Sequence, residues 1–140
     1  MNLIFQFHAT GIDWSLVPAI LKEVGMSHHS AERHQLAFVN SHSVVFVWDE
    51  NQLIGFGRAI SDGILQAALY DVAVRPSYQG KGIGKTIVSE LVHHCPGCNV
   101  ILYASPSKEK FYEKLNFRRM KTAMALFTDA ERKRERGFTE

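Results

Sequence analysis

The sequence predicts a mixed α/β fold in which one central sheet carries helices on both faces. Short β-branched and aromatic runs alternate with segments whose apolar residues recur every three or four positions. Three of the runs follow one another with only turn residues between them, which predicts antiparallel hairpins. A later run is followed by a helical segment and then another run, as in a parallel crossover. The expected order is β-α-α-β-β-β-α-β-α-β.

The first third of the chain supplies one strand and two helices. Residues 2–8 are short and apolar, which suits a strand. Asp13 can cap a helix that ends near Val24, although Pro18 within this pattern indicates that the helix begins later than Asp13. Ser30 can cap a second, shorter helix.

The middle of the chain carries the sheet. The runs 43–48 and 53–60 flank an Asp-Glu-Asn turn and predict a hairpin, and a third strand follows over 64–74. A helix is expected over 82–94, where its apolar residues fall on one face, and Cys95-Pro96-Gly97 ends it. The run 99–104 predicts a buried strand.

The last part of the chain predicts one more helix and one more strand. Pro106 suits the first turn of a helix that Ser105 caps and that runs to about Leu115. Residues 120–127 are expected to form the last strand. We expect a single domain over residues 1–128, followed by a charged, flexible tail over residues 129–140.

Composition and charge narrow the class of protein. The 140 residues are 46% hydrophobic and 21% charged, the balance of a globular domain that buries its own core. A net charge of +2 does not favour nucleic-acid binding, and the longest apolar runs are too short to cross a bilayer. The two cysteines do not form a secreted disulfide framework, and the first residues do not resemble a signal peptide. We therefore expect a cytoplasmic protein.

The most informative segment is the glycine-rich turn Gln79-Gly80-Lys81-Gly82-Ile83-Gly84, which lies between a strand and a helix. Glycine lets the backbone turn tightly, and the free N–H groups and dipole of a helix start attract an anion. Lys81 and Lys85 add positive charge. The segment predicts a pyrophosphate site, with a turn whose glycines serve packing alone as the alternative. Its glycine spacing fits neither the Walker pattern nor the dinucleotide fingerprint.

Two motifs resemble those of a known family. Gln79, Gly82 and Gly84 match the pattern (Q/R)-x-x-G-x-(G/A), which is motif A of the GNAT superfamily of N-acetyltransferases. Residues 104–117 resemble motif B of that family, except that Asn116 stands where glycine is usual. Asparagine tolerates the left-handed conformation that a helix end requires, so this turn should form. The resemblance implies acetyl-CoA as co-substrate and no metal.

The resemblance also implies the residues that hold the coenzyme. The strand 71–74 should part from the strand 99–104 and leave a cleft, in which the backbone of Val72 and Val74 would pair with the pantetheine arm. The amides of Gly80 to Lys85 would hold the pyrophosphate. The full implied set is Val72, Ala73, Val74, Gln79, Gly80, Lys81, Gly82, Ile83, Gly84, Lys85 and Ser105.

The implied catalytic residues are Tyr112 and Asp71. Tyr112 matches the family tyrosine that lies near the thioester sulfur and could protonate the departing thiolate; an ordinary buried aromatic is the alternative. The family glutamate is missing, because its candidate positions hold Ala68 and Tyr70. Asp71 is the nearest carboxylate, and it could bind or deprotonate the amine or be purely structural. Strand alternation places Tyr70 and Asp71 on opposite faces.

Two further groups of residues have ordinary explanations. Cys95-Pro96-Gly97-Cys98 is similar to a redox or metal motif, but it follows a helix C-terminus, and a helix-ending turn is the favoured interpretation. Histidines gather before the first hairpin, where the family builds its acceptor site, and one of them could act as a base. They are His28, His29, His34 and His42.

Three functions fit these features. The leading one is transfer of acetyl to a primary amine of a small molecule by direct attack, as in the arylalkylamine-like branch of the family. The second is acetylation of a protein lysine or N-terminus, and the third is a non-catalytic acyl-CoA-binding sensor. We expect no nucleic-acid or membrane partner, and dimers are common in this family, which makes a homodimer a further expectation.

Overall fold

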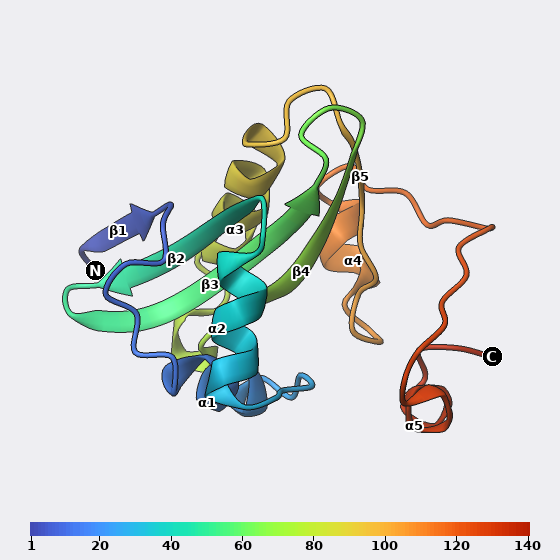
Figure 1. Ribbon diagram of the computed structural model, residues 1–140, viewed down its shortest axis with the longest axis horizontal. Helices are drawn as coiled ribbons and strands as arrows, with labels where there is room; N and C mark the ends of the chain where they lie inside the picture. Colours follow the sequence, from blue (N-terminus) through green and yellow to red (C-terminus); the bar gives the residue numbers. More distant parts are fainter. The chain divides into compact units, whose positions relative to one another are not determined.

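A five-stranded sheet organises the first part of the molecule. The computed structural model describes residues 1–140, which form two units, Met1–Leu102 and Tyr103–Glu140. The strands of the first unit lie in the order β1-β2-β3-β4-β5 (Figure 1). Their bounds are Leu3–Gln6, Ser43–Asp49, Gln52–Ser61, Gln66–Val74 and Asn99–Ile101. Neighbouring strands are antiparallel except β4 and β5, which are parallel and connected through helix α3 (Ile83–His93).

Helices α1 (Leu16–Glu23) and α2 (Ala31–Val39) lie together on one side of the sheet (Figure 1). Ser30 caps α2 as expected, because its Oγ accepts the Arg33 N–H at 3.3 Å. Helix α1 begins at Leu16 rather than at Asp13. Pro18 is thus its third residue, where the missing N–H costs no helical hydrogen bond.

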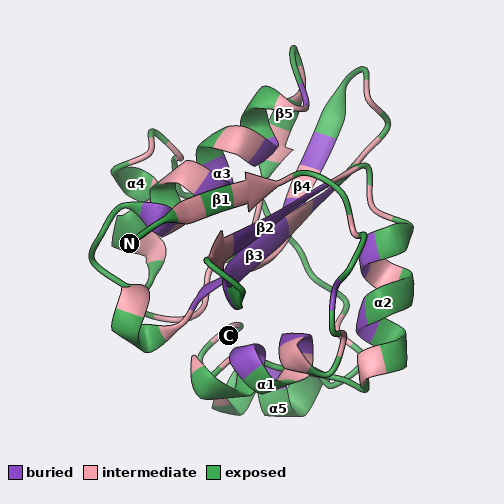
Figure 2. Cartoon of the chain, turned by 90° about the vertical axis from the view of Figure 1, so that its left-hand side faces the viewer, coloured by how far each residue is buried: buried purple, intermediate pink, exposed green.

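Three phenylalanine rings form the centre of the core between this helical layer and the sheet. Phe38 of α2 lies 5.3 Å from Phe46 of β2 and 5.8 Å from Phe56 of β3, measured between ring centroids. The residues Val44–Val47 of β2 are all buried, since both faces of this strand are covered. Figure 2 shows that burial concentrates along β2 and β3.

Helix α3 covers the opposite face of the sheet and approaches it closely. Ile87 and Leu91 are buried beneath it. A Cβ atom built on Gly57 of β3 would lie 2.8 Å from Ile87 Cγ2 and 3.1 Å from Leu91 Cδ1. Glycine at this position therefore sets the distance between α3 and the sheet. Helices on both faces confirm the predicted fold class.

The second unit contains helices α4 (Glu109–Glu113) and α5 (Ala130–Glu135). Helix α5 falls in the segment for which we expected a flexible tail. Its Lys133 is buried, pairs with Asp129 at 3.0 Å and lies over the rings of Phe127 and Phe138 at 5.4 and 5.3 Å. This charged segment thus forms a short helix whose Lys133 contacts two aromatic rings. The domain boundary at residue 128 stays a prediction.

Two predictions for this region were wrong. Residues 120–127 form no strand, because an extended segment needs a partner for its backbone groups and this one has none. Its Met124 and Leu126 side chains are 95% and 101% exposed. The last motif helix begins at Glu109 and not after Ser105, because Ser107 adopts a left-handed φ of 76° that helical backbone does not allow.

Candidate functional site

Most of strand β4 lacks a partner on the β5 side. Strand β5 pairs only with Gln66, Ala67 and Ala68, and it ends at Ile101 instead of continuing to Ala104. The rest of β4, residues 69–74, continues without a parallel neighbour. The family resemblance implied two strands that part over 71–74 and 99–104; here β5 ends at Ile101, and the second part of β4 keeps an edge free of a parallel strand. A ligand with its own amide groups can pair with such an edge as an added strand does.

A β-bulge lies in this part of β4, which pairs with β3 alone. Phe56 pairs with Ala73 and Arg58 pairs with Tyr70, so Gly57 opposes both Asp71 and Val72. Asp71 takes a left-handed φ of 56°, which aspartate tolerates better than most residues. The extra residue turns the following backbone, that of Val72 to Val74, relative to the first half of the strand.

The bulge also changes which way two side chains point. We expected Tyr70 and Asp71 on opposite faces, and this was wrong. Asp71 Oδ2 lies 2.7 Å from Arg58 Nε, and the Arg58 guanidinium also lies 5.3 Å from the Tyr70 ring centroid. Both side chains therefore reach the same guanidinium, because the left-handed residue breaks the two-residue period.

The glycine-rich turn follows the 3₁₀ helix η1 (Pro76–Tyr78) and has two left-handed glycines. Gly80 has a φ of 78° and Gly82, the N-cap of α3, has a φ of 82°; a Cβ atom would meet nothing at either position. Backbone conformation, and not close packing, is what requires glycine here. The glycines thus serve the turn, and the alternative of packing alone is excluded for these two.

The N-terminus of α3 presents donors to one place. The first hydrogen bond of this helical turn runs from the Thr86 N–H to the Gly82 carbonyl at 3.1 Å. The N–H groups of Ile83, Gly84 and Lys85 precede it and therefore have no helical acceptor. Lys81 and Lys85 are exposed beside them. Amides, a helix dipole and lysines are the features that attract an anion to a helix N-terminus.

Side chains hold the base of the turn in place. Gln79 Nε2 donates to the Val74 carbonyl at 2.9 Å, so the implied coenzyme residue Gln79 links the two ends of the turn. Arg75 Nε donates to the Leu53 carbonyl at 2.9 Å. Tyr78 Oη donates to Asp49 Oδ2 at 2.6 Å, which lowers the pKa of Asp49 and raises the pKa of Tyr78. The sequence motif did not indicate these braces.

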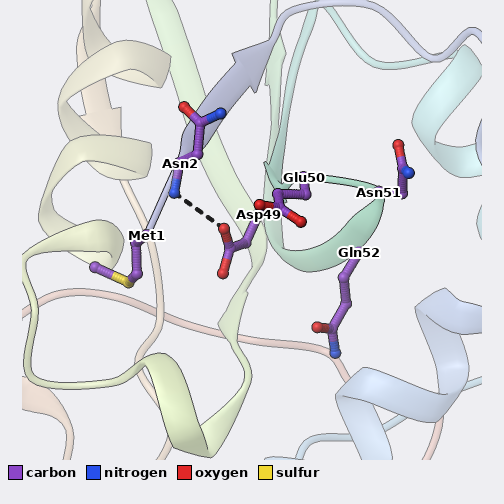
Figure 3. A pocket seen from close by; sticks show the side chains of 6 residues that line it. All are labelled: Met1, Asn2, Asp49, Glu50, Asn51 and Gln52. Carbon is purple, nitrogen blue, oxygen red and sulfur yellow. Dashed lines mark hydrogen bonds between the residues drawn. The ribbon is translucent and has the colours of Figure 1, made fainter.

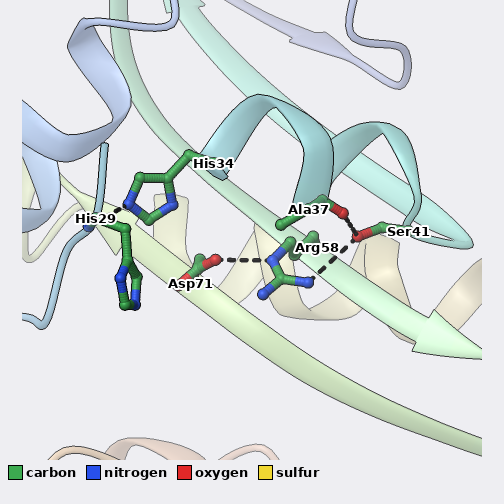
Figure 4. A network of polar contacts seen from close by, with 6 residues as sticks. All are labelled: His29, His34, Ala37, Ser41, Arg58 and Asp71. Atoms are coloured by element: carbon green, nitrogen blue, oxygen red, sulfur yellow. Dashed lines mark hydrogen bonds and ion pairs between the residues drawn. The ribbon is translucent and has the colours of Figure 1, made fainter. Parts of the chain in front are cut away.

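The Arg58–Asp71 pair extends into a polar network (Figure 4). The two side chains are only 15% and 18% exposed. Arg58 also donates to Ser41 Oγ at 3.4 Å, and Ser41 donates to the Ala37 carbonyl of α2 at 2.7 Å. Asp71 thus connects β4, through Arg58 of β3 and Ser41, to α2. This is the structural role that the sequence allowed for Asp71 as an alternative to catalysis. Sequence reasoning missed Arg58, whose only signal was one cation in an apolar strand.

His34 lies in the same region and is buried. Its Nε2 accepts the His29 backbone N–H at 2.8 Å, so this nitrogen carries a lone pair and the ring is neutral. Burial lowers the pKa of His34, and the nearby Asp71 carboxylate opposes that shift. Of the four histidines named as possible bases, His34 therefore has a structural role. Its Nε2 already accepts a hydrogen bond and is not available to take a proton from an amine.

Tyr112 lies in α4 of the second unit. Its ring packs edge-on against Phe111 at 4.9 Å and Phe117 at 5.8 Å. Burial raises the pKa of Tyr112, which keeps its phenol protonated at neutral pH. Asn116, at the end of this motif, has the left-handed φ of 72° that we expected.

Other surface features do not coincide with the predicted residues. A polar hollow at the β2–β3 turn is lined by Met1, Asn2, Asp49, Glu50, Asn51 and Gln52 (Figure 3). Asp49 accepts the Asn2 N–H there at 3.0 Å. No three His, Cys, Asp or Glu side chains come together as metal ligands. No helix has the length and hydropathy that crossing a membrane requires.

Comparison with known proteins places this fold and turn in a family. Residues 40–119, which include β4, the turn and α3, match the family model described as an acetyltransferase (GNAT) domain. The chain therefore belongs to the GNAT acetyltransferase family.

Two curated relatives resemble the chain over much of its length. It is 34% identical to serotonin N-acetyltransferase 2, chloroplastic, of Oryza sativa subsp. japonica, over 78% of this chain and 58% of that protein. It is 36% identical to an uncharacterized N-acetyltransferase of Prochlorococcus marinus, over 67% of this chain and 56% of that protein. The chain thus spans little more than half the length of these relatives.

Solved structures share the fold. A GNAT-family acetyltransferase from Streptococcus pneumoniae superposes with a TM-score of 0.76 at 21% identity, over 91% of this chain and 98% of that one. Glucosamine-6-phosphate N-acetyltransferase from Arabidopsis thaliana gives a TM-score of 0.66 at 21% identity, over 90% and 99% of the two chains. Both confirm the architecture of a mixed sheet with helices.

Proposed function

We propose that this chain transfers an acetyl group from acetyl-CoA to a primary amine of a small molecule. The observation that carries the proposal is the anion site at the start of α3, directly after a strand edge without a parallel neighbour. The start of α3 suits a diphosphate, and the strand edge suits a chain of amide groups. Coenzyme A contains both groups. Family membership and the likeness to a serotonin N-acetyltransferase support the reaction.

The residues present fit the coenzyme. The amides from Gly80 to Lys85 would hold the diphosphate, with Lys81 and Lys85 adding charge. The backbone of Val72 and Ala73 would pair with the pantetheine arm. The Val74 carbonyl already accepts Gln79, so Val74 contributes less to that pairing than the resemblance implied. The Ser105 contact is the weakest member of the set, because Ser105 caps no helix in this structure.

Tyr112 is the acid in this proposal, as the family resemblance implies. Acetyl-CoA, when bound, supplies an activated acetyl thioester. The raised pKa of Tyr112 keeps a proton on its oxygen that a departing thiolate can take. Asp71 serves chiefly to position Arg58 and the bulge, since its carboxylate already accepts the guanidinium. Deprotonation of the amine then falls to water.

One observation favours the acyl-CoA sensor as a second candidate. Asp71 is the sole carboxylate in β4, and it is paired with Arg58. A chain that binds the coenzyme without a base to activate the amine would show just this arrangement. The cytoplasmic location and the homodimer expected from the sequence stay predictions. The two cysteines, both free thiols, fit a reducing compartment.

Calorimetry and a thiol-release assay test the proposal together. Wild type should bind coenzyme A and release thiol from acetyl-CoA with at least one amine of a panel of arylalkylamines, amino sugars and lysine peptides. Tyr112→Phe should keep coenzyme affinity and lose about 100-fold in kcat, because it removes only the acid. Tyr103→Phe, the matched control in the same unit, should leave both unchanged.

The other outcomes are distinct. Binding without turnover on any amine would select the sensor. A preference for lysine peptides would select the protein acetyltransferase. Absence of affinity for coenzyme A in the folded protein would contradict all of these functions.

A further inference from the structure

The Cys95-Pro96-Gly97-Cys98 segment forms a hydrogen-bonded β-turn that brings the backbones of two cysteines close together. The Cys98 N–H donates to the Cys95 carbonyl at 3.2 Å. Pro96 and Gly97 occupy the central positions, and Gly97 has a φ of 78°, which is the type II pattern. The end residues of a β-turn have Cα atoms less than about 7 Å apart. Disulfides span Cα separations of roughly 4.4 to 6.8 Å, so the turn brings these cysteines into range.

A turn whose only role is to end a helix would explain Pro96 and Gly97. It would not explain why each cysteine sulfur lies beside a polar side chain. Cys95 Sγ lies 3.8 Å from His42 Nδ1, and Cys98 Sγ lies 3.7 Å from Ser61 Oγ. His42 immediately precedes β2 and Ser61 ends β3. Two separate segments of the sheet thus each place a polar side chain against one of the two thiols. These contacts are remote in sequence and independent of the turn.

The two thiols differ in access. Cys95 is 2% exposed, whereas Cys98 is partly exposed. Both are free cysteines, not bonded to each other. The pair therefore has one cysteine that is partly open to solvent and one that is buried beside an imidazole. Attack at the outer sulfur followed by closure from the inner one is the order that this arrangement favours.

We propose that Cys95 and Cys98 are a redox-active dithiol that exchanges with low-molecular-weight disulfides of the glutathione type. Cys98 Sγ attacks the small disulfide, forms a mixed disulfide and releases one small thiol. His42 Nδ1 takes the Cys95 proton, Cys95 Sγ attacks Cys98 Sγ, and the second small thiol leaves with that proton. The protein loses two electrons and two protons, and the small disulfide gains both.

The closed form would fasten the end of α3 to the start of β5. Cys95 follows the last turn of α3, and Cys98 directly precedes β5. This connection lies at the end of α3 remote from the glycine-rich turn. The assignment is therefore independent of coenzyme binding, and it can hold or fail whether or not the chain transfers acetyl groups.

Mass spectrometry of the full chain after incubation with oxidised glutathione tests the proposal. The expected product is monomeric, lighter by two hydrogen atoms, and resistant to alkylation until a dithiol reductant is added. Cys95→Ser should stop at the mixed disulfide on Cys98, since no second thiol displaces the glutathione. Cys98→Ser should react far more slowly, because only the buried thiol remains.

Two further results decide the roles of the sulfurs and the histidine. His42→Asn should slow ring closure roughly 100-fold, while His93→Asn, a surface control on α3, should leave the rate unchanged. The proposed dithiol exchange would be wrong if the wild-type chain kept glutathione bound, or if it formed a disulfide between two chains. Equal closure rates in wild type and His42→Asn would overturn the assignment of His42 as proton acceptor.

Discussion

Asp71 combines a left-handed backbone with a half-buried charge, and the two can be separated by mutation. Asparagine keeps the backbone preference and the shape but removes the charge, whereas alanine removes both. We expect Asp71→Asn to lower the free energy of unfolding by about 1 to 2 kcal/mol, because Arg58 then lacks its partner. Asp71→Ala should cost about 1 kcal/mol more, through strain at a φ of 56°.

Urea denaturation measures the free energy of unfolding of both variants and of a double variant that combines Asp71→Asn with Arg58→Met. The double variant should lose less than the sum of the single ones, since no charge is left unpaired. Equal losses for asparagine and alanine would mean that the left-handed conformation at residue 71 carries no energetic weight.

His34 makes stability depend on pH. Burial lowers the pKa of His34 below the ordinary value of 6.5, so the unfolded chain binds a proton more readily than the folded one. Its contribution is complete above pH 6.5 and is lost as the pH falls from there through the lowered pKa. The free energy of unfolding should fall in wild type as the pH drops below about 6.5, and less steeply in His34→Gln.

Denaturant titrations at several pH values follow this effect. The exposed His93 is the control, and His93→Gln should keep the wild-type slope. Parallel profiles for His34→Gln and wild type would show that some other group is responsible.

At the scale of elements, the contact between α3 and the sheet depends on one missing methyl group. Gly57→Ala would place a Cβ atom 2.8 Å from Ile87 Cγ2, and such overpacking costs about 1 to 3 kcal/mol. Thermal unfolding should show the loss. Leu91→Ala opens space beside the new methyl group, so Gly57→Ala should cost less in that background. A loss of the same size in both backgrounds would argue against this steric explanation.

The elements predicted correctly are those whose periodicity is set by burial. The hairpin of β2 and β3 and helix α3 follow directly from apolar patterns, because each packs against the rest of the first unit. The same logic failed over residues 120–127, where an apolar pattern exists without a neighbouring strand. The bulge at Asp71 was also hidden, since its cause is the pairing with β3 and not a local residue preference.

At the scale of the whole molecule, the sequence indicated the glycine-rich turn and the start of α3 but not the residues that brace them. Glycines and a helix start lie close in the chain, so a local motif indicates them. Arg58, Ser41 and Asp49 reach the site region from other elements, and only the folded chain brings them there. The fold class was predicted from the order of the elements, so it is correct even though residues 120–127 do not form the predicted last strand.

The end of the chain offers a test at this scale. Deleting residues 129–140 removes Lys133 and Phe138 and leaves Phe127 without its cation. We expect a loss of about 1 kcal/mol in the free energy of unfolding, whereas deleting only residues 139–140 should have no effect. Identical denaturation curves for all three chains would favour the flexible tail over residues 129–140 that the sequence predicted.

The bracing of the glycine-rich turn has a thermodynamic consequence. Gln79, Arg75 and Tyr78 already hold the approach to α3 in one shape, through bonds to β4, β3 and the end of β2. In the proposed function, the diphosphate would meet donors that are preorganised, and the loop would give up little conformational entropy on binding. The affinity of this site is then set by how well an anion replaces water at amides already in position.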